Sequence, residues 1–370
     1  MADSRGGLFA GVPRHFENSV AAFLGSIPIF LFTLIGGVVA DRMDRRRLLI
    51  LSQVIQLTCA FLLASLIYVH VVQIWHILTL SFIVGTAQAF GGPAYQALVP
   101  SLVEPEDLPN AIALQSIQFN LARVIGPIVG GIAFTKLGYV WCFSLNGFSY
   151  IAVIISLVLL TIRFIPAKAE VSMMTSMKQG IAFIRNQSAM ESLIVLAFCM
   201  TFLGIPLLTF LPVFTKSVFR EGPSTFTTML SVFGAGSVVG ALMVAAMGNI
   251  QNKGRIALSM LVFLGMMMTG FALSKILILN YVMLFLAGVA LISVFAMISS
   301  LVQLITGNEM RGRVMSVYNV AFRGGMPIGS LVTGWLVPRF TAPLVLAVNG
   351  TLLFVLGLYF LLIQRKVAKL

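Results

Sequence analysis

Two long apolar runs meet at the stretch Gly36-Gly-Val-Val-Ala-Asp-Arg-Met-Asp-Arg-Arg-Arg47. The run before it, 18–40, and the run after it, 47–69, each hold the roughly 20 mostly apolar residues that an α-helix needs to cross a bilayer. The arginine cluster between them is typical of a cytoplasmic loop, because such loops carry an excess of Lys and Arg. The stretch therefore predicts two transmembrane helices joined by a short basic turn.

The same pattern recurs along the 370-residue chain. We expect eleven transmembrane helices, over 18–40, 47–69, 73–97, 109–135, 139–162, 191–215, 224–248, 255–274, 277–303, 311–337 and 342–364. Composition agrees, because only 9% of the residues are charged, against about 25% in a soluble domain. The net charge of +13 does not indicate nucleic-acid binding, since basic stretches interleaved with aromatic residues are missing. The sequence predicts an all-α polytopic membrane protein without a nucleic-acid partner.

The loops between these spans differ in charge. Most Lys and Arg residues outside the spans fall on the side that holds the loop at 41–47. Positive residues are enriched on the cytoplasmic side of membrane proteins. We therefore expect a multi-pass protein of the bacterial inner membrane whose C-terminus is cytoplasmic and whose N-terminus is outside.

The longest hydrophilic stretch follows the fifth span, near residues 163–190. Within it, residues 177–185 have apolar side chains at helical spacing, which indicates a short amphipathic helix on the membrane surface. This division predicts an N-terminal bundle of five spans in 1–162, a cytoplasmic linker in 163–190 and a bundle of six spans in 191–370.

Two segments match at an offset of 200 residues. The first contains a Ser, an Arg and a Pro whose spacing recurs in the second: Ser116, Arg123 and Pro127, then Ser316, Arg323 and Pro327. Coincidence is one explanation, but the equivalent place of each set in its half favours duplication, an architecture of transporters. The fourth span then corresponds to the tenth, so the repeat has six helices. We expect one helix to be missing from the first half.

The loop at 36–47 resembles the signature loop of the major facilitator superfamily, in which a glycine precedes Asp-Arg and a basic cluster. Residues 90–131, which end in Gly126-Pro127-Ile-Val-Gly130-Gly131, are similar to the enterobactin-exporter and macrolide-efflux branch, the transmembrane secretion effectors. Asp44 departs from the family pattern, which has glycine there.

The resemblance implies a two-bundle fold lacking the first family helix, because the signature loop joins the second and third of twelve helices. It also implies a secondary active transporter that moves a small amphipathic or anionic solute outward across the inner membrane by alternating access. The Gly-Pro-x-x-Gly-Gly sequence resembles the tail of the antiporter motif, which implies proton coupling, although a glycine expected earlier in that motif is absent. The alternative is a truncated, non-transporting membrane protein or a fragment of such an exporter.

The gating candidates lie in the signature loop: Gly37, Asp41, Arg42, Arg45 and Arg46. Gly37 allows a neighbouring helix to approach closely. Asp41 can cap the positive end of another helix, a contact typically worth about 0.3–1 kcal/mol. The arginines can hold acidic partners in one conformation and release them in another. Alternatively, they only anchor the loop on the cytoplasmic side.

Arg123 and Arg323 are the intramembrane charges. Counted from the expected helix starts, they lie roughly 18–21 Å into the bilayer at 1.5 Å per residue. A buried arginine is costly and indicates a functional site, here one that attracts an anionic or polyhydroxylated solute. Alternatively, either one bridges helices through backbone carbonyls, or Arg123 pairs with an acid on the missing helix. Gln88 and Tyr95 are further candidates for solute binding, or for interhelical hydrogen bonds.

Several small or kinking residues are candidates for helix packing or gating: Pro93, Gly126, Pro127, Gly130 and Pro327. All eleven acidic residues fall in tails, loops or span ends, so a coupling carboxylate lay on the missing helix or transport is not proton-driven. No nucleotide-binding loop, metal-ligand cluster or nucleophile–base pair is evident. The sequence predicts no enzyme, metal or cofactor, and a monomer whose partners are a small-molecule substrate and the bilayer.

Overall fold

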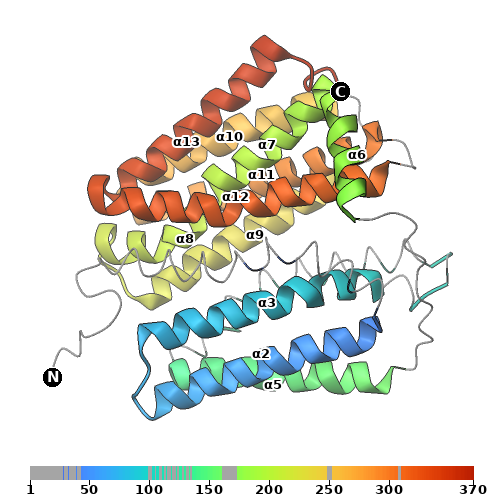
Figure 1. The fold of residues 1–370 in the computed structure, drawn as a ribbon. Helices are drawn as coiled ribbons and strands as arrows, with labels where there is room; N and C mark the ends of the chain where they lie inside the picture. Colours follow the sequence, from blue (N-terminus) through green and yellow to red (C-terminus); the bar gives the residue numbers. More distant parts are fainter. Residues whose placement is uncertain are drawn as a thin grey trace.

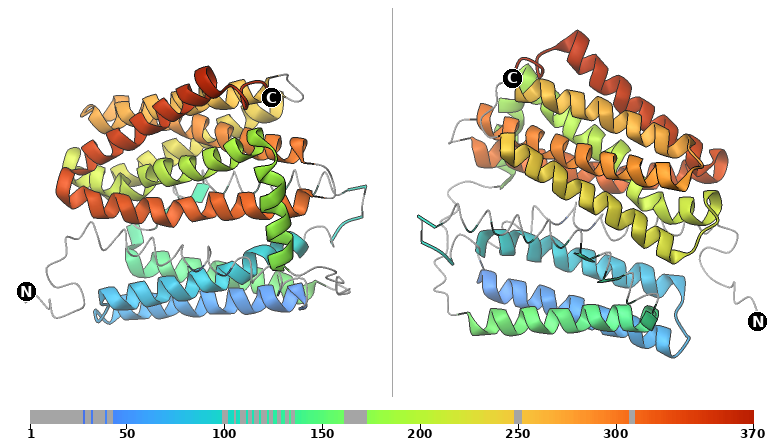
Figure 2. Two further views of the ribbon diagram at one scale, coloured as in Figure 1. Left: turned by 45° about the horizontal axis from the view of Figure 1, so that its top comes forward. Right: turned by 180° about the vertical axis from the view of Figure 1, so that it is seen from behind.

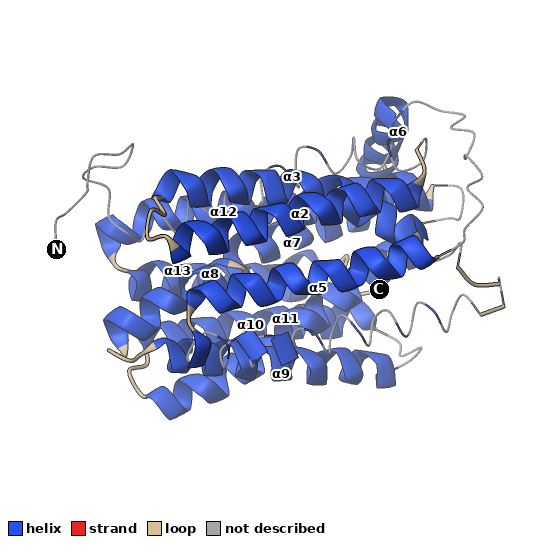
Figure 3. Cartoon of the chain, turned by 90° about the horizontal axis from the view of Figure 1, so that it is seen from below, coloured by secondary structure: helices blue, strands red, loops and turns tan. Residues whose placement is uncertain are grey.

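The computed structural model describes residues 43–98, 102–104, 106–107, 136–160, 173–247, 252–306 and 310–370, with isolated helical positions between 28 and 39 and isolated or paired ones between 111 and 133. These residues form helices and turns and contain no strand. Figure 1 shows two groups of helices, one built from the first part of the chain and one from the second. Figure 3 shows the long helices running in one general direction, with α6 standing across one end.

The first group consists of α2 (Arg45–Tyr68), α3 (Ile74–Leu98) and α5 (Tyr139–Leu159). Helix α2 packs against both of the others. The contact between α2 and α3 is close because Ser52 lies over a glycine, Gly91, at which a β-carbon would collide with the serine side chain. The Ser52 hydroxyl also donates a hydrogen bond of 2.7 Å to the Ala87 carbonyl of α3.

The second group holds the remaining helices: α6 (Met173–Arg185), α7 (Ser188–Gly204), α8 (Pro206–Val213), η2 (Phe214–Val218), α9 (Pro223–Met247), α10 (Lys253–Leu273), α11 (Leu277–Ile305), α12 (Arg311–Phe340), α13 (Ala342–Leu358) and η3 (Tyr359–Gln364). Helix α9 pairs with α11, α10 with α13, and α12 with α7. Glycines make the first pairing close, since β-carbons at Gly236 and Gly240 would collide with the backbone of α11. Small residues let membrane helices approach in this way.

Eight helical segments among the described residues are long and apolar enough to cross a membrane. Helix α12 is 30 residues long but less apolar, because its arginines include one near its middle. The expected spans 18–40 and 109–135 lie largely outside the described residues. The predicted all-α polytopic class is confirmed, whereas the number of eleven spans stays a prediction.

The expected span 191–215 is interrupted at Pro206. Helix α7 begins at Ser188, three residues earlier than predicted, and ends at Gly204, and α8 begins at Pro206. Proline has no N–H to donate to the carbonyl four residues earlier, which here belongs to Phe202. Pro93 and Pro327, in contrast, lie inside the continuous helices α3 and α12.

Helix α6 crosses the end of the second group, as two views show (Figures 1 and 2). It packs against α12 and α7. A β-carbon at Gly180 would lie only 2.7 Å from the Arg313 carbonyl oxygen, so the α6 backbone rests directly on the first turn of α12. A helix lies within the segment between the two groups, as the apolar spacing there indicates.

Candidate functional site

A chain of hydrogen bonds crosses the first group at Gln56, a side chain of α2 that is 5% exposed. Its Oε1 accepts hydrogen bonds of 3.3 Å from Gln88 Nε2 of α3 and from the Tyr150 hydroxyl of α5. Its Nε2 donates to the hydroxyl and the carbonyl oxygen of Ser52, at 3.2 and 3.3 Å. A buried amide is thus satisfied by all three helices, which fixes the orientation of Gln88.

Gln88 and Tyr95 lie on one face of α3, because seven residues make nearly two helical turns. Gln88 is exposed, and Tyr95 is 38% exposed. Between them, a β-carbon at Gly92 would meet no described atom within 4 Å. We call Gln88, Gly92 and Tyr95 the α3 strip. Helix α3 lies on the side of its group that is toward α9 and α12 (Figures 1 and 2). The exposure of Gln88 and Tyr95 makes this strip a candidate wall for a solute path.

Sequence reasoning did not identify Gln56 or Tyr150. The signal was present in α2, where Ser52 and Gln56 stand four residues apart in an apolar run and therefore share one helix face. The partner helices could not be inferred, since they depend on how α2, α3 and α5 pack.

Arg323 lies on α12 and is half-buried. It is twelve residues after the first residue of the helix, a rise of roughly 18 Å at 1.5 Å per residue. Within the part of the chain that the structure describes, no carboxylate forms an ion pair with it and no carbonyl accepts a hydrogen bond from it. Its neighbour Phe322 packs against Phe295 of α11, with ring centroids 4.7 Å apart. This half-buried guanidinium therefore has no partner among the described residues.

A side chain at the end of the signature loop links α2 to α5 by hydrogen bonds. Arg46 Nε donates a 2.6 Å hydrogen bond to the Leu157 carbonyl of α5, and its Nη2 donates to the Val158 carbonyl. A cation that binds the last carbonyls of a helix satisfies orphan acceptors and complements the helix dipole. Arg45 is the first residue of α2, and Gly37, Asp41 and Arg42 lie outside the described residues.

Asp44, which stands where the family pattern has glycine, is the N-cap residue of α2. Its Oδ1 accepts hydrogen bonds from the backbone N–H groups of Arg46 and Arg47, at 2.9 and 3.3 Å. The Arg47 side chain also lies 3.6 Å from the Asp44 carboxylate. Aspartate is among the preferred N-cap residues. The sequence could have revealed this cap, since an aspartate directly precedes the helical run.

The remaining candidates differ in what surrounds them. β-carbons at Gly126 and Gly130 would meet no described atom within 4 Å, so the structure shows no close helix contact at either one. Pro327 is buried in α12. Arg123 and Pro127 lie outside the described residues.

The acidic side chains that the structure describes lie in loops or at helix ends: Asp44, Glu104, Glu106, Asp107, Glu191 and Glu221. Among the described residues, no group of three or more His, Cys, Asp and Glu side chains could hold a metal ion. The described candidates for the solute path carry an amide, a phenol and a guanidinium: Gln88, Tyr95 and Arg323.

Known proteins resemble this chain over nearly its whole length. Macrolide efflux protein A of Streptococcus pyogenes is 23% identical and is aligned over 92% of this chain and 85% of its own. The multidrug efflux pump Tap of Mycolicibacterium fortuitum is 23% identical, over 86% and 80%. The enterobactin exporter EntS of Salmonella typhi is 23% identical, over 92% and 82%.

Solved structures share the fold. The peptide transporter POT in complex with sulfate superimposes with a TM-score of 0.75 at 14% identity, over 100% of this chain and 89% of that one. The nucleoside transporter NupG does so with a TM-score of 0.67 at 16% identity, over 94% and 89%. These similarities confirm the predicted two-bundle transporter fold.

Residues 18–369 match the family model of the transmembrane secretion effectors. The match confirms the predicted family and favours a transporter over both a non-transporting membrane protein and an enzyme. The chain belongs to the transmembrane secretion effector family of major-facilitator membrane transporters.

Proposed function

We propose that this chain is a secondary active transporter that exports a small amphipathic or anionic solute by alternating access. Three relatives are named for efflux or export, of macrolides, of multiple drugs and of enterobactin. Their shared direction supports export. The variety of these solutes supports a path that accepts amphipathic molecules rather than one fixed skeleton.

Two observations carry this proposal: the exposed α3 strip in the first group and, in the second group, an arginine that has no partner among the described residues. Gln88 is held by the buried Gln56 at 3.3 Å, and Tyr95 offers a ring with a polar end. Arg323 offers a cation that has no described counter-ion. Polar sites at the interface of two helical units suit alternating access, since rocking of the units opens such an interface to either side. We assign Arg123 the equivalent part in the first half.

The signature loop is the proposed gate. Arg46 already binds the end of α5, so a movement of α5 relative to α2 would break this contact. Gly37 provides room for a neighbouring helix, Asp41 caps a helix end in one conformation, and Arg42 and Arg45 exchange acidic partners. Asp41→Asn distinguishes a gate from a membrane anchor: the variant keeps normal expression and transports more slowly. Wild-type rates in this variant would contradict the gating role.

We further propose that the protein lies in the bacterial inner membrane with a cytoplasmic C-terminus, as the distribution of Lys and Arg indicates. It functions as a monomer without nucleic acid, because one chain supplies helices on both sides of the proposed path. A C-terminal reporter that is active only in the cytoplasm tests the orientation.

The central experiment measures uptake into inside-out vesicles from cells that express the protein. Export from a cell then appears as accumulation in the vesicle. We would compare an anionic, a neutral and a cationic labelled amphiphile. The expected result is accumulation of the anionic probe, reduced tenfold or more by Arg323→Ala, since losing a charge-assisted hydrogen bond costs about 1.5–3 kcal/mol.

The matched control for Arg323→Ala is Arg339→Ala. Arg339 is on the same helix but at its exposed end, where it donates to the Trp335 carbonyl at 2.8 Å. We expect Arg339→Ala to keep wild-type accumulation. Equal loss in both variants, or no accumulation of any probe above that of vesicles without the protein, would contradict the proposal.

Repeating the assay with and without a pH gradient tests proton coupling. The Gly126–Gly131 sequence supports coupling by its resemblance to the antiporter motif. The described acidic side chains offer no carboxylate at membrane depth, so any coupling group among them would act at a helix end. If accumulation is equal in both conditions, proton coupling is excluded and another driving force must be sought.

A further inference from the structure

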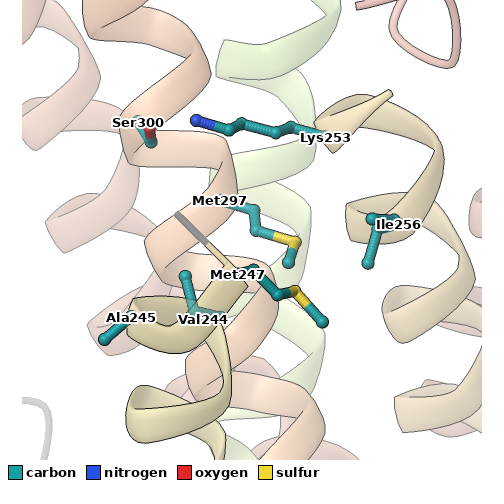
Figure 4. Close-up of a pocket in the computed structure, with 7 residues that line it drawn as sticks. All are labelled: Val244, Ala245, Met247, Lys253, Ile256, Met297 and Ser300. Atoms are coloured by element: carbon teal, nitrogen blue, oxygen red, sulfur yellow. The ribbon is translucent and has the colours of Figure 1, made fainter. Parts of the chain in front are cut away.

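A cavity of about 270 Å³ lies where the ends of three helices of the second group meet. Its walls come from α9, α10 and α11, as Figure 4 shows. The residues that line it are Val244, Ala245, Met247, Lys253, Ile256, Met297 and Ser300. None of them belongs to the proposed solute path, so this cavity is a separate feature of the protein.

Two polar side chains, Lys253 and Ser300, line this cavity. Figure 4 shows the Lys253 side chain extending from the start of α10 toward Ser300 of α11. Neither side chain forms a hydrogen bond or ion pair with another described residue. Lys253 is also the first residue of α10, where the helix dipole adds positive potential. An ammonium group, a hydroxyl and a helix start at one place favour an anionic ligand.

The rest of the lining is apolar and adaptable. Met297 is 3% exposed and forms part of the wall, and Met247 adds a second flexible thioether. Methionine side chains accommodate ligands of varied shape. Ala245 is exposed and is therefore part of the rim. The preferred ligand thus combines an acidic group with an apolar part.

The size of the cavity restricts this ligand further. Its volume lies just below the roughly 300–1,000 Å³ of typical small-molecule sites. A headgroup and the adjoining part of a chain fit, whereas a whole phospholipid does not. The cavity lies at the end of the bundle that the charge distribution assigns to the cytoplasm. Anionic lipids give that leaflet its negative surface potential, and basic pockets between transmembrane helices bind acidic lipid headgroups there.

We propose that this cavity binds the acidic headgroup of an anionic phospholipid, with the phosphate at Lys253 and Ser300 and the start of the acyl region against Met247 and Met297. The bound lipid contacts the ends of α9, α10 and α11, the three helices that line the cavity. The site is independent of the exported solute.

The test uses the full-length protein purified in a neutral detergent. The thermal unfolding temperature is measured against the concentration of a short-chain phosphatidylglycerol. Phosphatidylcholine with the same chains is the neutral-lipid arm, and inorganic phosphate is the free-anion arm. We expect a saturable rise with phosphatidylglycerol alone, because a ligand that binds only the folded state raises its stability.

Two variants and one control locate the site. Lys253→Gln removes the cation and should weaken the apparent Kd for phosphatidylglycerol tenfold or more. Ala245→Leu narrows the rim at an exposed position, keeps Lys253 and should weaken the same Kd. Arg255→Gln is the matched control, since Arg255 is exposed on the same helix end and does not line the cavity.

Several results would overturn the proposal. Equal stabilisation by phosphatidylcholine would show that the headgroup charge is not recognised, and equal stabilisation by inorganic phosphate would show that no lipid is needed. An unchanged Kd in both Lys253→Gln and Ala245→Leu would place the lipid elsewhere. The same loss in Arg255→Gln as in Lys253→Gln would indicate a general surface charge effect.

Discussion

Gly329 of α12 lies against the backbone carbonyl of Phe202 on α7, so closely that a β-carbon at this glycine would collide with it. Phe202 is the residue whose carbonyl would accept the N–H of residue 206, and Pro206 has none. Pro206 thus leaves the Phe202 carbonyl without its helical hydrogen bond. Gly329 allows the backbone of α12 to pack against that carbonyl. A Cα–H···O contact of this kind is worth about 0.5–1 kcal/mol.

Gly329→Ala should therefore destabilise the protein. The added methyl group must push α12 away from α7, and such overpacking costs typically about 1–3 kcal/mol. We expect a fall of several degrees in the thermal unfolding temperature of the purified protein. Gly92→Ala is the matched control, because nothing described lies within 4 Å of a β-carbon there. The explanation fails if the two variants unfold at the same temperature.

Gln56→Leu should weaken both stability and solute binding. Gln88 and Tyr150 would lose the acceptor to which each donates at 3.3 Å, and a typical intramolecular hydrogen bond contributes about 0.5–1.5 kcal/mol. Because Gln88 would no longer be fixed on the α3 strip, we expect a higher apparent KM in the vesicle assay. Thr58→Val is the control, since Thr58 is on the same helix and donates only within it, to Val54 at 2.9 Å. An unchanged KM in Gln56→Leu would show that Gln88 does not take part in solute binding.

Substitutions of Asp44 test the helix cap. Asp44→Ala should cost about 0.5–2 kcal/mol, whereas Asp44→Gly, which restores the family residue, should cost only a few tenths. Asp44→Asn keeps an acceptor oxygen and should stay near the wild type. Thermal unfolding of the three variants gives the order of stability. An alanine variant as stable as the asparagine variant would show that the two backbone hydrogen bonds contribute nothing.

Gly180→Leu tests the contact between α6 and α12. Its β-carbon would lie 2.7 Å from the Arg313 carbonyl oxygen, so we expect α6 to leave its place on α12. Limited proteolysis should then cut the chain between the two groups several times faster. The exposed neighbour Gln179 provides the control Gln179→Leu. Equal cleavage of the two variants would mean that the glycine does not hold α6 in place.

Much of this protein follows from local sequence. The length and apolarity of the runs predict membrane helices, because the bilayer leaves no other way to satisfy a spanning backbone than a helix or a closed barrel. The loop before Arg47 and the stretch 90–131 are short-range patterns, and they led to the family. The aspartate directly before α2, Asp44, already indicated the N-cap of this helix.

The contacts of the candidate site depended on tertiary structure. Gln56 and Gln88 meet because α2 and α3 pack closely at Gly91, and no local pattern states which two helices become neighbours. The same holds for Arg46 and the end of α5, which lie 111 positions apart in the chain. Sequence alone determined which segments enter the membrane, since insertion depends on each segment's own composition. Only the packing decided which polar groups face one another, because a lone amide or arginine is costly in the membrane until a neighbouring helix or a solute satisfies it.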